Sequence, residues 1–89
     1  MDKEALHREL KQLHAELQRV DTADTNDREM LEKLATDIWR ILGREELDPD
    51  HYRSLRERLR EAVAQFEASH PRATMLMREL IDQLAYMGI

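Results

Sequence analysis

Apolar residues recur at alternating spacings of three and four along almost the whole sequence. In the first twenty residues the pattern is carried by Leu6, Leu10, Leu13, Leu17 and Val20. Residues at these spacings fall on one side of an α-helix and match the a and d positions of a heptad. A chain built from such stripes buries them by packing helix against helix. The pattern therefore predicts an all-α protein without strands.

Length and composition agree with a small helical protein. The chain has 89 residues, of which 37% are charged and 42% apolar, with two Gly, two Pro and no Cys. We expect a single domain over residues 1–89 with a thin core, because a chain of this length buries only about 60–65% of its unfolded surface. Without Cys there is no disulfide or thiolate site, which fits a reducing compartment. No apolar run is long enough to span a membrane, and the charged start is unlike a signal peptide, so we expect a soluble cytoplasmic protein.

The first two helices are predicted around a polar connector. The first should run from Asp2 to Val20, with a stripe narrow enough for one packing partner to cover. The second should run from Asp27 to Arg44, with Asn26 or Thr25 as its N-cap and Gly43 supplying a left-handed residue at its end. Its apolar face is wider and needs two neighbours, so this helix is either central in the monomer or shared with a second chain. The residues of that face are Leu31, Leu34, Ile38 and Ile41, flanked by Met30, Ala35, Trp39 and Leu42.

Asp48-Pro49-Asp50 is the most specific local signal for a helix start. Asp48 serves as N-cap, and Pro49 occupies the first helical position, where its missing N–H costs nothing. The third helix should bury Tyr52, Leu55, Leu59, Ala62, Val63 and Phe66. A last helix from Pro71 to Met87, closed by Gly88, should bury Ala73, Leu76, Met77, Leu80, Ile81 and Leu84.

Two interpretations compete at Pro71. Proline lacks the N–H that would bond back to Glu67 and disfavours helical geometry at His70, so a helix should end there, with Ser69 or His70 as the cap of the next. Alternatively, helices three and four form one Pro-kinked helix, because apolar residues from Tyr52 to Met87 keep a spacing of seven through the proline. We favour the break, because Ser-His before Pro is a familiar helix-initiation pattern.

The excess negative charge of the chain is concentrated in and beside the predicted connections between helices. The formal net charge is −5, yet Asp21, Asp24 and Asp27, with Glu45, Glu46, Asp48 and Asp50, all lie in or beside the two connections. Carboxylates at these places cap helix starts and complement the positive end of the helix dipole. The net charge therefore indicates helix capping rather than a dedicated acidic binding surface.

No pattern in the sequence predicts catalysis, a metal site or a cofactor. His7 and His14 stand one heptad apart, about 10 Å along a helix, which is too far for one metal ion. Ser54 and Ser69 lack the glycine-rich elbow that would expose a nucleophile. The many carboxylates alternate with Arg and Lys at one-turn spacing, as they do on solvated helix faces. We therefore expect a protein that is not an enzyme.

Two surfaces are candidates for binding a partner. The first is the face of the second helix around Trp39, because tryptophan is enriched at the centres of interfaces. Its residues are Leu31, Ala35, Trp39 and Leu42. The second is the arginine side of the third helix, formed by Arg53, Arg56 and Arg60, which is a candidate nucleic-acid face. Glu57 and Glu61 interrupt the arginines and no aromatic residues interleave with them, which disfavours binding to bases.

The sequence also resembles a known family over essentially its whole length. The opening Met1-Asp2-Lys3-Glu4-Ala5-Leu6, the segments Leu59-Arg60-Glu61-Ala62-Val63 and Phe66-Glu67-Ala68-Ser69-His70-Pro71, and the ending Leu84-Ala85-Tyr86-Met87-Gly88-Ile89 carry the resemblance. They are similar to the domain-of-unknown-function family 4404, a family of short bacterial proteins. The resemblance implies a compact bacterial helical protein and supplies no activity, cofactor or site residue.

These observations together predict about four amphipathic helices in an antiparallel bundle with left-handed packing. The expected function is a non-enzymatic interaction or structural protein that forms a homodimer through the second helix. The alternative is a nucleic-acid-associated regulator that uses the arginine side of the third helix.

Overall fold

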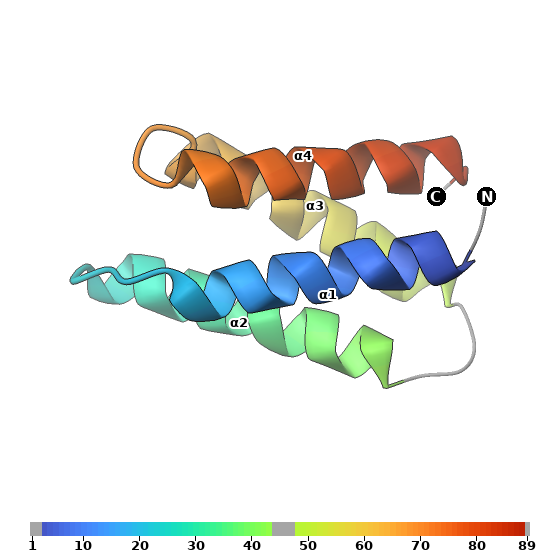
Figure 1. Cartoon of the computed structure of the whole chain (residues 1–89), viewed down its shortest axis with the longest axis horizontal. Helices are drawn as coiled ribbons and strands as arrows, with labels where there is room; N and C mark the ends of the chain where they lie inside the picture. The colour runs from blue at the N-terminus through green and yellow to red at the C-terminus, as the bar shows by residue number, and fades with distance from the viewer. Residues whose placement is uncertain (1–2, 44–47, 89) are drawn as a thin grey trace.

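Four α-helices pack side by side in the computed structural model, which describes residues 3–43 and 48–88. They are α1 (Lys3–Arg19), α2 (Thr25–Leu42), α3 (Pro49–Phe66) and α4 (Pro71–Tyr86). Consecutive helices run antiparallel, and α4 returns to pack against α1, so the four helices close into a ring (Figure 1). The described residues contain no strand. The predicted all-α antiparallel bundle is therefore confirmed.

The core lies along the axis of this ring and is filled by the apolar stripes. Each helix places residues spaced three and four apart toward the axis, as the heptad pattern predicts. The side chains that are almost completely buried include Leu6, Leu10, Leu13, Ile38, Leu55, Leu59, Phe66, Met77, Leu80 and Leu84. Four residues of the predicted apolar stripes, Val20, Val63, Leu76 and Ile81, are only partly buried and pack against its edge.

The ring gives every helix two neighbours, which corrects the prediction for α1. The narrow stripe of α1 suggested a single packing partner, but α1 contacts both α2 and α4. The stripe serves two neighbours because Leu6, Leu10, Leu13 and Leu17 point to the axis, where both neighbours meet them. The helix α2 likewise has two neighbours, α1 and α3, so it is no more central than the others.

The second helix begins and ends differently from the prediction. Asp24, rather than Asn26 or Thr25, is the N-cap: its Oδ1 accepts a hydrogen bond from the backbone N–H of Asp27 at 3.1 Å. Gly43 follows the helix with φ −80°, so it is not the left-handed residue that we expected. Any residue can adopt that conformation, and glycine is not required there.

The start of α3 and the end of α4 follow the sequence signals. Asp48 is the N-cap of α3 and accepts from the backbone N–H of Asp50 at 3.0 Å, with Pro49 in the first turn. Gly88 follows α4 with φ +81°, a left-handed conformation that favours glycine, and its N–H donates to the carbonyl of Ala85. Glycine closes a helix in this way without a steric penalty.

The chain breaks at Pro71 and folds back, so the favoured interpretation is confirmed and the kinked helix is wrong. The helix α3 ends at Phe66, a tight turn occupies residues 67–70, and α4 begins at Pro71. His70 is the N-cap, but its side chain makes no capping hydrogen bond. The buried hydroxyl of Thr74 donates back to this turn and lies 3.2 Å from the carbonyl oxygen of His70 and 3.0 Å from that of Pro71.

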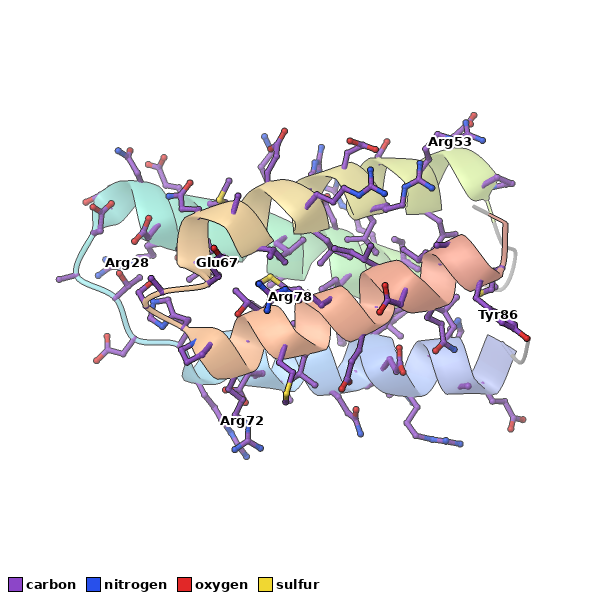
Figure 2. All side chains as sticks on the ribbon, turned by 90° about the horizontal axis from the view of Figure 1, so that it is seen from above. Arg28, Arg53, Glu67, Arg72, Arg78 and Tyr86 are labelled. Atoms are coloured by element: carbon purple, nitrogen blue, oxygen red, sulfur yellow. The ribbon has the colours of Figure 1, made fainter. Side chains whose placement is uncertain are left out.

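Polar side chains fasten the ends of the bundle. Arg78 and Glu67 point toward one another where α3 turns into α4, with 2.7 Å between Nη2 and Oε2 (Figure 2). At the same end, Nε2 of Gln65 donates to Oδ1 of Asp27 at 2.6 Å, which joins the end of α3 to the start of α2. Tyr86, at the opposite end of α4, points out into solvent (Figure 2).

Some predictions concern residues outside the described ranges. The start of the first helix at Asp2, the end of the second at Arg44, the acidic pair Glu45 and Glu46, and the chain end at Ile89 are among them. Within the described ranges, no helix is both long and apolar enough to cross a membrane.

Candidate functional site

Trp39, on the outer side of α2, is a large apolar side chain that the bundle leaves exposed. Its side chain is 66% exposed, although tryptophan buries a large apolar area wherever it is packed. The position follows from the helix itself: Ile38 points to the core, and the next residue along an α-helix lies about 100° further round. The same geometry that buries Ile38 therefore presents Trp39 to solvent.

A groove lies beside Trp39, between α1 and α2. Its volume is about 460 Å³. The imidazole of His14, on α1, packs against the indole with ring centroids 5.6 Å apart and planes inclined by 35°. This contact holds the indole as one wall of the groove. The lining residues are Lys11, His14, Ala15, Trp39, Leu42 and Gly43.

The four residues predicted for an interface divide between core and surface. Trp39 and Leu42 line the groove, and Leu42 is partly buried. Leu31 and Ala35 are buried in the bundle, where they pack with the other core residues. The wide face of α2 is thus covered in large part by α1 and α3, and the part left open is its edge at Trp39 and Leu42.

The sequence did not predict the contribution of α1 to this groove. His14 drew attention only as a possible metal ligand with His7, and Lys11 and Ala15 carried no signal. Their proximity to Trp39 depends on the register between two antiparallel helices, which heptad spacing alone does not fix. An aromatic residue just outside the α2 stripe was the only available signal.

The arginines of the predicted nucleic-acid face are engaged by neighbouring carboxylates. Nη1 of Arg53 lies 2.9 Å from Oδ1 of Asp50, and both Arg56 and Arg60 have a guanidinium nitrogen 3.8 Å from Oε1 of Glu57. Acidic residues on the same helix thus interrupt the positive stripe that a phosphate backbone would need.

The histidines and carboxylates do not form a metal centre within residues 3–43 and 48–88. No group of three His, Asp or Glu side chains in these ranges is placed to share one ion. His14 is engaged by Trp39, and His51 has its Nδ1 3.6 Å from Oδ2 of Asp48.

Among the described residues, Glu9 and Tyr52 have displaced pKa values, and both lie away from the groove. Burial, with a smaller contribution from the carboxylate of Glu79, raises the pKa of Glu9 at the contact between α1 and α4. Burial also raises the pKa of the Tyr52 phenol, near the start of α3. Both shifts are consequences of packing, and neither group is paired with a nucleophile.

Comparison with known proteins identifies the family of the chain but assigns it no activity. No curated protein and no solved structure has significant similarity to the chain. One family model matches residues 6–89, from the first buried leucine of α1 to the end of the chain. The match covers α1 from Leu6 onward, the other three helices, the turn before Pro71 and both walls of the groove beside Trp39. The chain therefore belongs to the family described as domain of unknown function DUF4404.

Proposed function

We propose that this protein is a non-enzymatic interaction protein that self-associates as a dimer through the groove between α1 and α2. The observation that carries the proposal is the exposure of Trp39 at the wall of an apolar groove of about 460 Å³. A tryptophan that is held in place and mostly exposed loses little freedom on binding and gains a large buried area.

The charges along the same face favour a second copy as the occupant. Glu32 lies one heptad before Trp39 on α2 and is exposed on the same side of the helix. Lys11 lines the groove at the other end of this stripe. A twofold axis across the face would place Lys11 of one protomer opposite Glu32 of its partner, and the reverse contact would form by symmetry.

The size of the bundle limits how strong this dimer can be. The molecule measures 36 × 22 × 20 Å, so one whole side has about the area that a standard interface takes from each partner, roughly 800 Å². The dimer would need most of the α1–α2 side. We therefore expect a dissociation constant in the micromolar range or above, about 10⁻⁶ M at the tightest.

Self-association can be tested with the single tryptophan of the chain. The mass from sedimentation equilibrium should rise with concentration from 10.6 kDa toward twice that value, and the emission of Trp39 should shift to the blue in parallel. Trp39→Ala should stay monomeric. Tyr86→Ala is the matched control, because Tyr86 is an even more exposed aromatic, lies on α4 and does not line the groove.

Charge reversal tests which partner occupies the groove. Lys11→Glu and Glu32→Lys should each weaken the dimer, and the double variant should restore it. Lys33→Glu serves as a control, because Lys33 lines a different hollow, between α2 and α3. A wild-type protein that stays monomeric up to about 1 mM would overturn self-association.

The nucleic-acid alternative receives less support from the contacts. Its three arginines lie beside Asp50 and Glu57, which lowers the net positive charge they can offer to phosphates. Electrophoretic retardation of DNA or RNA at low salt, abolished in an Arg53, Arg56 and Arg60 triple glutamine variant, would favour this alternative over the dimer.

A further inference from the structure

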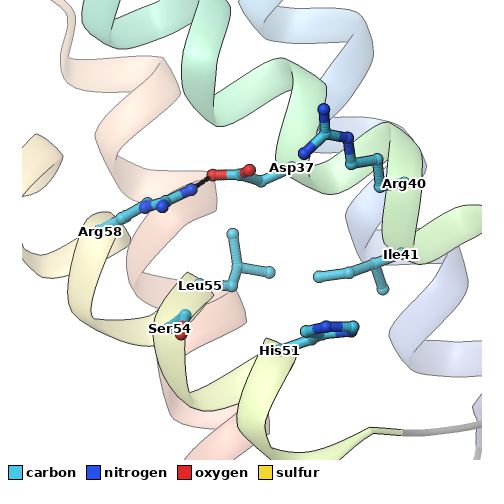
Figure 3. A pocket seen from close by; sticks show the side chains of 7 residues that line it. All are labelled: Asp37, Arg40, Ile41, His51, Ser54, Leu55 and Arg58. Atoms are coloured by element: carbon cyan, nitrogen blue, oxygen red, sulfur yellow. Dashed lines mark ion pairs between the residues drawn. The ribbon is translucent and has the colours of Figure 1, made fainter.

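A second cavity lies between α2 and α3, on a different side of the bundle from Trp39. Its volume is about 240 Å³, and it opens between the last turns of α2 and the first turns of α3 (Figure 3). The residues that line it are Asp37, Arg40, Ile41, His51, Ser54, Leu55 and Arg58. No pattern in the sequence points to this combination of residues.

Cationic and hydrogen-bond-donating groups dominate the rim of this cavity. Arg58 forms an ion pair with Asp37 and stays 42% exposed, whereas the Asp37 side chain is only 18% exposed. The ion pair with this largely buried carboxylate thus holds the arginine in place. A guanidinium has five N–H donors, so an ion pair through one nitrogen leaves others that can reach a ligand.

Arg40 supplies a second guanidinium on the opposite wall. Figure 3 shows the carboxylate of Asp37 between the side chains of Arg58 and Arg40. Within the described ranges, no carboxylate forms an ion pair with Arg40. One carboxylate thus lies between two guanidinium groups, and the rim keeps an excess of positive charge.

The rest of the lining suits a small ligand. His51 lies on the α3 side of the cavity, and its Nδ1 lies 3.6 Å from Oδ2 of Asp48. Its other ring nitrogen, Nε2, takes no part in that contact. Leu55 and Ile41 form an apolar floor, visible in Figure 3 between the polar groups. A volume of about 240 Å³ admits a group of several heavy atoms and excludes a folded partner.

Ser54, His51 and Asp37 share this cavity without forming a catalytic triad. In a triad the histidine bridges the serine and the acid. Here Asp37 pairs with Arg58, and the histidine faces a different carboxylate, Asp48. The lining is therefore arranged for binding and not for nucleophilic attack.

We propose that this cavity binds a small oxyanion, a phosphate or carboxylate group, at its rim, through the N–H groups of Arg40 and Arg58 that Asp37 does not engage. Planar guanidinium groups match the geometry of both oxyanions, and hydrogen bonds between charged partners are stronger than neutral ones. Asp37 acts as a positioning residue that orients Arg58. The apolar floor accommodates a short hydrocarbon part attached to the anionic group.

The binding test is a titration of the ¹⁵N-labelled protein followed by amide chemical shifts at constant ionic strength. The probes are inorganic phosphate, phenyl phosphate and benzoate, with benzyl alcohol as the uncharged analogue. Saturable shifts should appear around residues 37–41 and 51–58 with the anions and not with benzyl alcohol. Tighter binding of phenyl phosphate than of inorganic phosphate would identify an ester as the ligand, whereas tighter binding of benzoate would identify a carboxylate.

Two variants of equal charge decide whether binding is specific. Arg40→Gln should weaken binding by about tenfold, because it removes one of the two guanidinium groups. Arg53→Gln should leave the affinity unchanged, because Arg53 pairs with Asp50 and does not line the cavity. Unchanged shifts elsewhere in the spectrum verify that each variant is folded. Shifts that do not saturate, or an equal loss in both variants, would overturn the proposal.

Discussion

The imidazole of His70 packs against the phenyl ring of Phe66, with ring centroids 5.7 Å apart, across the turn that separates α3 from α4. The backbone N–H of His70 also donates to the carbonyl of Phe66 at 2.8 Å. The fold-back is thus secured by a ring contact and a hydrogen bond before Pro71 is reached. Proline is accordingly a supporting feature of this turn.

Pro71→Ala should therefore keep the four-helix ring. We expect a loss of about 0.4–1 kcal/mol in the free energy of unfolding, because the alanine chain gains freedom mainly in the unfolded state. Urea denaturation followed by circular dichroism measures this loss. A variant with greater helical content and a larger mass would instead mean that α3 and α4 had fused into one rod.

Thr74→Val should destabilise the protein by about 1 kcal/mol, since valine has nearly the same shape and cannot hydrogen-bond. The lost contacts are those of the hydroxyl with the carbonyl oxygens of His70 and Pro71. Thermal unfolding measures the effect. Thr74→Ser is the control, because it keeps the hydroxyl and loses only a methyl group. Equal losses in both variants would show that packing of the methyl group matters more than the hydrogen bond.

Glu9→Gln should stabilise the protein near pH 7. Burial and Glu79 raise the pKa of Glu9 in the folded state, so between the ordinary pKa of 4.5 and the raised value the folded protein binds more protons than the unfolded chain. Stability attributable to Glu9 therefore falls as pH rises through that window. Glutamine removes the partly buried charge and its repulsion by Glu79, and because solvent screens this site we expect a gain of about 0.5 kcal/mol or less at pH 7.

The measurement is the free energy of unfolding of wild type and variant at about pH 4 and at about pH 7. The ordinary pKa of a glutamate side chain lies between these two pH values. The gain should be larger at the higher pH. Asp82→Asn removes an exposed carboxylate from α4 and serves as the matched control. A gain of the same size at both pH values would contradict the assigned cause.

The ion pair between Asp37 and Arg58 should show a coupling energy of about 1 kcal/mol in a double-mutant cycle of Asp37→Asn and Arg58→Gln. The pair joins two helices, and its carboxylate is largely buried. Arg53 and Asp50 are much more exposed and belong to one helix, so the equivalent cycle there should give a smaller value. Equal couplings would mean that burial adds nothing to the first pair.

The sequence predicted those features that depend on neighbouring residues. The cap at Asp48-Pro49, the break before Pro71 and the glycine at the end of α4 are each set by two or three adjacent residues, and all three were found. Gly43 was predicted to be left-handed because glycine often closes a helix, yet the chain leaves α2 with φ −80°. Glycine permits the left-handed conformation without enforcing it.

The sequence could not predict features that depend on the axial register between two helices. The contact of His14 with Trp39 and the pair of Asp37 with Arg58 each require knowing which turn of one helix lies beside which turn of another. A repeat of three and four fixes the buried side of each helix but allows several axial offsets. The groove beside Trp39 and the cavity beside Arg58 each lie between two helices, so neither could be predicted residue by residue.

The closure of the ring by α1 and α4 also has a kinetic consequence. The other three helix contacts join neighbours in sequence, whereas this one joins opposite ends of the chain. Loop closure costs more entropy as the loop lengthens, so the hairpins α1–α2 and α3–α4 should form early and the α1–α4 seam late. Substitutions in that seam should then accelerate unfolding and leave the rate of folding nearly unchanged.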